Sequence, residues 1–220
     1  MQNLKAGDLY FNASIKGKSY TELPVADVTF GFNNVELINP ITKRKIKNLN
    51  LKGHFNSGMK EDLSQAILTI SKLNADFPDG KLKLSGSVNN FDQPEFDTDL
   101  FLKADVTGLD KVFKLDFLGN LKGKIEISDR FKGKYINKEK RFASEVNIGK
   151  IYLENFGFNI PGTIKFDKVD GIISRNNDNY SFDSLSIISN DTDILINGEI
   201  KNLQYLFFNI EKEITADLTI

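Results

Sequence analysis

The 220-residue chain has no cysteine and no tryptophan, and His54 is its only histidine. Without cysteine the chain can form no disulfide, no thiol nucleophile and no cysteine-ligated zinc site. A lone histidine is typical of a strand or surface position, and no nucleophile-elbow, zinc-protease, phosphate-loop or dinucleotide motif occurs. No paired acid and base of the glycosidase type is identifiable either. We therefore expect no enzymatic activity, no cofactor and no catalytic residue.

A metal site is equally poorly supported. Asp191-Thr192-Asp193 begins like a calcium-binding loop, but Leu195 occupies the fifth position and no glycine or terminal glutamate follows. We interpret this segment as a polar turn and expect no metal.

The chain also lacks an excess of charge and a long apolar run. Its formal net charge is −1, so no global field attracts nucleic acid or anionic headgroups, and we expect no nucleic-acid partner. No stretch approaches the roughly 20 apolar residues of a membrane-spanning helix. Lys5, Asp8, Asn12 and Lys16 interrupt any signal-peptide core near the start. We expect a fragment of a larger protein, with an added Met1 and with targeting signals outside this sequence.

What the sequence does contain is apolar residues at every second position, in one short segment after another. Clear cases are Leu9-Phe11-Ala13-Ile15, Leu82-Leu84-Val88 and Leu100-Leu102-Ala104-Val106. A period of two predicts half-buried β-strands with one apolar and one polar face. The candidate strands are residues 8–16, 24–32, 34–39, 45–55, 65–77, 81–89, 97–106, 119–128, 130–136, 142–149, 150–158, 162–167, 169–175, 179–188, 192–200 and 212–220.

Local signals refine this pattern. Pro78-Asp79-Gly80 predicts a hairpin turn with a positive φ at Gly80, and residues 176–179 (NNDN) predict another turn. The apolar phase changes between Ile70 and Leu73, which predicts a β-bulge near Ser71-Lys72. Two segments, 109–114 and 202–208, break the strand rhythm and predict short helical turns.

A weak internal repeat is also visible. Residues 82–91 (LKLSGSVNNF) match residues 194–203 (ILINGEIKNL) in their apolar, glycine and asparagine positions, within repeat units of 65–113 and 180–208. Repetition of a strand unit favours an extended sheet. We predict an all-β fold with one long, mostly antiparallel sheet and one or two helical turns.

Several of these segments resemble the AsmA-like family, which includes the TamB and YhdP groups of periplasmic β-groove, bridge-like lipid transfer proteins. The resemblance rests on residues 77–82 (FPDGKL), 85–91 (SGSVNNF), 106–113 (VTGLDKVF), 190–194 (NDTDI) and 203–206 (LQYL), and it covers most of 65–220. The abundance of asparagine, lysine, phenylalanine and isoleucine is similar to that of Bacteroidota members.

This resemblance implies that residues 1–220 form one continuous segment of a sheet that curls into an open apolar groove. Phospholipid acyl chains would lie in the groove, and the protein would serve phospholipid transport between inner and outer membranes or outer-membrane assembly. It also implies a periplasmic location, an inner-membrane anchor absent from this chain and a possible outer-membrane protein partner. The expected lipid-binding residues, each in phase with its strand, are Leu82, Leu84, Leu100, Leu102, Ile125, Ile127, Ile194 and Ile196.

Two alternatives remain open from the sequence. The same apolar residues would also suit a structural or adhesive β-sandwich whose two sheets cover each other. The basic cluster at residues 42–47 (TKRKIK) could contact phosphates, but it also fits a lysine-rich edge strand that discourages aggregation.

Overall fold

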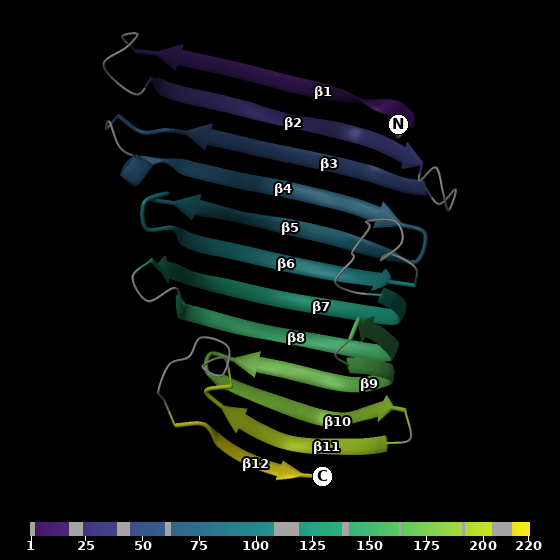
Figure 1. The fold of residues 1–220 in the computed structure, drawn as a ribbon. Coiled ribbons are helices and arrows are strands. Elements are labelled where there is room, and N and C mark those ends of the chain that lie inside the picture. Colours follow the sequence, from purple (N-terminus) through teal and green to yellow (C-terminus); the bar gives the residue numbers. More distant parts are fainter. Residues whose placement is uncertain are drawn as a thin grey trace. The chain divides into compact units, whose positions relative to one another are not determined.

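The computed structural model describes residues 3–17, 24–38, 45–59, 63–107, 119–137, 141–162, 164–190, 192–203 and 213–220. These residues form a single open, antiparallel sheet of twelve strands whose order follows the sequence (Figure 1). The strands are β1 (Asn3–Lys16), β2 (Val25–Ile38), β3 (Lys45–Asn56), β4 (Ile67–Phe77), β5 (Gly80–Asn89), β6 (Glu95–Asp105), β7 (Gly119–Ile136), β8 (Arg141–Ile160), β9 (Ile164–Asn176), β10 (Asn179–Ser189), β11 (Thr192–Lys201) and β12 (Thr215–Thr219). The prediction of an all-β fold with an open antiparallel sheet is confirmed.

Within the described ranges, one short helical turn interrupts the strands. The 3₁₀ turn η1 (Leu63–Gln65) lies between β3 and β4, and the backbone N–H of Ala66 closes it on the carbonyl of Leu63 at 3.1 Å. No pattern in the sequence predicted this turn. The two predicted turns, 109–114 and 202–208, lie outside the described residues, apart from Asn202 and Leu203.

Four of the observed strands each join two candidates that the sequence separated. β2 runs through Asn33 and Asn34, where the register with β3 shifts and Asn34 takes a positive φ of 51°. β7 runs through Asp129, β8 through Gly149 and Lys150, and β9 through Lys168. A bulge or a charged residue breaks the alternation without ending the hydrogen-bond ladder, so the pattern suggested too many strands.

The chain divides into two structural units, which are described separately below. Unit 1 comprises Met1–Phe101 and Arg130–Val146, and unit 2 comprises Leu102–Asp129 and Asn147–Ile220. β7 and β8 each contribute residues to both units.

The internal repeat corresponds to two hairpins of the same construction. β4 and β5 have the lengths of β10 and β11, and each strand lies 112 residues before its counterpart. Both hairpins have a register shift at the same place, after Ile70 in β4 and after Phe182 in β10. The predicted bulge at Ser71-Lys72 is thereby confirmed, and β10 has the equivalent bulge at Asp183-Ser184.

The turn between β4 and β5 is a hairpin, as predicted, but its glycine was assigned the wrong conformation. Phe77 pairs with Gly80, so the two-residue loop is Pro78-Asp79. Gly80 is not among the glycines with positive φ. It takes the last position of the turn and the first of β5, where an extended backbone suffices. The second predicted turn is also present, since Asn176 pairs with Asn179.

Bulges occur on β8 and β10 of unit 2, and side chains of the adjacent strands hold them. The backbone N–H of Asn155 on β8 donates to Asp170 Oδ1 at 2.6 Å, and that of Ser184 on β10 donates to Asn197 Oδ1 at 2.8 Å. Both bulge residues have positive φ, as does Gly198 on β11. A Cβ at Gly198 would overlap a backbone carbonyl oxygen of β12, so this close approach of strands requires glycine. Bulges bend strands and increase their twist.

Candidate apolar binding face

Strand register gathers the apolar side chains of unit 1 on one face of its sheet. Ala13, Val28, Phe55, Leu68 and Val88 are successive register partners across β1 to β5. Directly opposed residues in a sheet point to the same side. A second apolar row on the same side is Leu9, Phe32, Leu51, Leu73 and Leu84. We call this surface the apolar face of unit 1.

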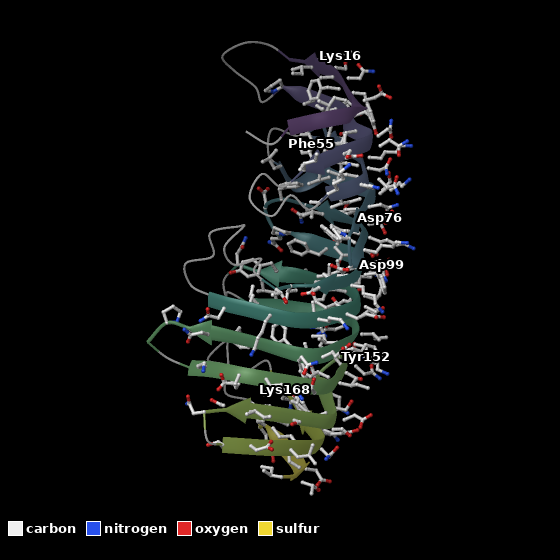
Figure 2. The ribbon with its side chains drawn as sticks, turned by 90° about the vertical axis from the view of Figure 1, so that its right-hand side faces the viewer. Lys16, Phe55, Asp76, Asp99, Tyr152 and Lys168 are labelled. Atoms are coloured by element: carbon white, nitrogen blue, oxygen red, sulfur yellow. The ribbon has the colours of Figure 1, made fainter. Side chains whose placement is uncertain are left out.

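The opposite side of the same strands is polar. Figure 2 shows Phe55 and Asp76 on opposite sides of the ribbon of unit 1, in agreement with the register. His54 is on the polar side, where its Nε2 lies 3.1 Å from Asp27 Oδ1, and Asn56 Nδ2 donates to Asp27 Oδ2 at 2.8 Å. The hydrogen bond from Asn56 and the contact with His54 lower the pKa of Asp27. The lone histidine therefore forms part of a hydrogen-bonded cluster with Asp27 and Asn56 on a water-facing surface.

The apolar face of unit 1 is open to solvent. On β1, Leu9, Phe11 and Ile15 are 70%, 74% and 66% exposed, and no large side chain of the described residues is fully buried. The chain exposes 14322 Å², whereas a folded monomer of 24.8 kDa is expected to expose about 10,000 Å². A self-covered core would bury most of these side chains.

One end of this face is closed by the η1 turn and by the turn that follows β5. Ala66 is fully buried, and its carbonyl accepts the backbone N–H of Asn90 at 3.0 Å. The Phe91 ring meets the Phe55 ring edge-on, with 6.0 Å between centroids. The η1 turn and the turn after β5 therefore border the apolar face of unit 1 at this end.

Unit 2 has a corresponding apolar face. Phe156, Val169, Ile187 and Ile194 are register partners across β8 to β11. Phe158 lies between Phe156 and Phe166, with ring centroids 5.6 Å and 4.9 Å away. A small cluster of buried residues anchors this face, and it consists of Ala104, Val106 and Leu121, with Leu102, Ile125, Phe156 and Phe158 packed against it.

A charged pair interrupts the apolar face of unit 2. Arg175 is the register partner of Gly149 and of Tyr180, and its guanidinium forms an ion pair with Asp129 of β7. A Cβ at Gly149 would overlap the Asp129 carboxylate, so this glycine makes room for the bridge across β8. Beside it, Asn147 is buried, and its Oδ1, like Arg175 Nε, has no hydrogen-bond partner among the described residues. Sequence alternation gave no sign of this pair, because its partners are 46 residues apart.

The residues expected to bind lipid all lie half-buried in these strands. In unit 1, Leu82 and Leu84 oppose Ala75 and Leu73, and Leu100 lies on β6. In unit 2, Ile194 and Ile196 oppose Ile187 and Leu185. The others are Leu102 and Ile125, which pack on the buried cluster, and Ile127, two residues beyond Ile125 on β7. Contact with lipid stays a prediction for all eight.

Several ion pairs on the described surface join neighbouring strands. The Arg130 guanidinium pairs with Asp97 and lowers the pKa of that carboxyl. Lys132 Nζ lies 2.7 Å from Glu145 Oε2 and lowers the pKa of Glu145. Of the basic cluster at residues 42–47, the described part begins at Lys45, which lies 3.1 Å from Glu36. No three metal-ligating side chains come together within the described ranges.

The chain was compared with protein families, curated proteins and solved structures. Neither a protein family, nor a curated protein, nor a solved structure matches it. Among the helices of the described residues, none has the length and apolar character needed to cross a membrane.

Proposed function

We propose that this chain is a non-enzymatic, lipid-binding segment of an AsmA-like envelope protein, in which acyl chains lie on the apolar faces of the two units. The observation that carries the proposal is the open sheet with aligned rows of half-exposed Leu, Ile, Val and Phe on one side. A soluble monomer rarely exposes contiguous apolar surface above a few hundred Å². An apolar ligand is the simplest partner for such a face.

The energetics favour an acyl chain. Burying one methylene group contributes about 0.8 kcal/mol, so a 16-carbon chain gains on the order of 10 kcal/mol along such a surface. No specific pocket is needed for this gain, because the hydrophobic effect is not directional. The headgroup stays in water at the open side of the sheet.

The cellular role follows from the resemblance described above. We propose that the whole protein acts in phospholipid transport between inner and outer membranes, or in outer-membrane assembly. It would act from the periplasm, with an inner-membrane anchor outside this chain and an outer-membrane protein as a possible partner.

Titration of the purified chain with a fluorescent fatty acid tests lipid binding on the apolar face. Leu82→Asp with Leu84→Asp places two charges on the apolar side of β5 and should weaken binding at least tenfold. The matched control is Ser85→Asp with Ser87→Asp, which adds the same charges to the other side of the strand and should bind like the parent. Equal affinity of both variants, or no binding by the parent, would reject the proposal and favour a structural role.

A further inference from the structure

We propose that the polar face of unit 1 docks on bilayers that contain anionic lipids, through a lysine patch formed by Lys52, Lys72 and Lys83. These three side chains come from β3, β4 and β5, on the side of the sheet that bears Asp76 (Figure 2). The inference does not depend on lipid binding by the apolar face, which is on the other side of the same strands.

The patch begins with two like charges placed directly against each other. Lys52 and Lys72 are register partners, and Lys83 follows one row further, opposite Asn74. Opposed residues have Cβ atoms about 5 Å apart, and like charges in this position destabilise a sheet. All three lysines are exposed, and none has an ion-pair partner among the described residues. An anionic surface would supply the missing counter-charge.

The strands around the patch have a strong local charge, although the whole chain is nearly neutral. β3, β4 and β5 together contain six lysines and a single carboxylate, Asp76. Asp76 is already engaged, since Asn48 Nδ2 donates to it at 2.6 Å and Lys81 Nζ lies 4.0 Å away. Most acidic residues of the adjoining strands also have partners: Glu36 pairs with Lys45, Asp27 contacts His54, and Asp97 and Asp99 pair with Arg130.

The second hairpin shows that the fold does not require these lysines. β10–β11 has the strand lengths and bulge of β4–β5, with every position 112 residues later. The positions of Lys72, Lys81 and Lys83 are there occupied by Ser184, Asp193 and Leu195. The same hairpin is thus built without a basic surface, so the lysines are a property of the first hairpin and not of its architecture.

The character of the patch favours a bilayer over nucleic acid. Lysine ammonium groups act as mobile point charges, whereas arginine gives the bidentate contacts typical of specific phosphate recognition. The three patch residues are all lysines on one side of a β-sheet surface. A diffuse anionic bilayer surface attracts each such lysine independently of geometry.

Co-sedimentation of the chain with vesicles tests this inference. The vesicles contain phosphatidylcholine alone or phosphatidylcholine with phosphatidylglycerol, at about 0.1 M and about 1 M salt. The parent should bind only the anionic vesicles, and only at the lower salt concentration. A Lys52→Gln/Lys72→Gln/Lys83→Gln variant should lose about 100-fold in partition coefficient, while the corresponding arginine variant should keep it.

The control removes three lysines that already have partners, Lys103, Lys124 and Lys168, which pair with Glu126, Glu154 and Asp170. Their replacement by glutamine changes net charge equally and should reduce binding far less. Equal losses in the two triple variants would overturn the inference, because net charge alone would then explain binding. Salt-independent binding to neutral vesicles, or binding of duplex DNA in place of vesicles, would also overturn it.

Discussion

The loss of stability on replacing Leu84 by aspartate distinguishes an open apolar face from a covered core. Leu84 and Leu73 form a half-buried pair in unit 1, whereas the equivalent pair in unit 2, Ile196 and Leu185, has a buried member, since Leu185 is only 5% exposed. Full burial of a leucine contributes about 1.5–3 kcal/mol, so half-burial of Leu84 contributes about 1 kcal/mol. The new carboxylate keeps its water, and Leu84→Asp should cost about 1–2 kcal/mol.

Leu185→Asp provides the contrast. There the carboxylate enters a dry site without a partner, and the lost burial and the desolvation together should cost at least about 4 kcal/mol. Urea denaturation followed by circular dichroism measures both values. For a chain of this size, thermal midpoints should fall by about 3 °C for Leu84→Asp and by more than about 10 °C for Leu185→Asp. Equal losses would refute the reasoning, because Leu84 would then be covered in the folded protein.

Three further predictions concern the backbone and the charged pairs. Gly198→Ala should destabilise the chain by about 2 kcal/mol or more in denaturant melts, because Gly198 has a φ of 129° and its Cβ would overlap β12; an unchanged midpoint would contradict that geometry. Arg130 lowers the pKa of Asp97, so the stability this pair contributes is present above about pH 4 and is lost as the pH falls; Asp97→Asn should flatten the acid limb of a stability–pH curve, and an unaltered limb would argue against the pair. Arg175→Met leaves Asp129 uncompensated on an apolar face and should cost about 2 kcal/mol, while adding Asp129→Leu should restore most of it; no recovery in the double variant would show that the bridge itself stabilises the sheet.

Alternation was sufficient to predict the strand content and one of the irregularities. The bulge at Ser71-Lys72 was predictable because apolar residues change phase within one uninterrupted run, and the hairpin at Pro78-Asp79 because turn residues separate two such runs. These signals are local, and each strand pairs with the strands that precede and follow it in the sequence. The two matching sequence segments fall on β5 and β11, and the equal bulges of β4 and β10 became visible only with the register.

The remainder depends on contacts that a local pattern does not encode. Asn34 and Asp129 look like strand ends in the sequence, yet the strands continue through them. Asp129 is acceptable on an apolar face only because Arg175 reaches it over Gly149. The prediction of a positive φ at Gly80 was wrong because the two-residue loop ends at Asp79, so Gly80 already belongs to β5.

For the candidate site, the sequence was sufficient to predict which residues lie on an apolar strand face, but not whether that face is open to a ligand. Period two identified Leu82, Leu84, Ile194 and Ile196 as members of apolar strand faces, and the register places each among apolar neighbours. Whether such a face is covered depends on the strand topology, which only the structure gives.

Native mass spectrometry of the purified chain is the most direct test of acyl-chain binding on the apolar face. The chain, expressed in a bacterium and purified without detergent, should carry phospholipid that appears as discrete mass increments. The Leu82→Asp/Leu84→Asp variant should lose most of this lipid, and the Ser85→Asp/Ser87→Asp control should retain it. A parent chain that is lipid-free, and that stays lipid-free after incubation with phospholipid vesicles, would contradict the proposed function.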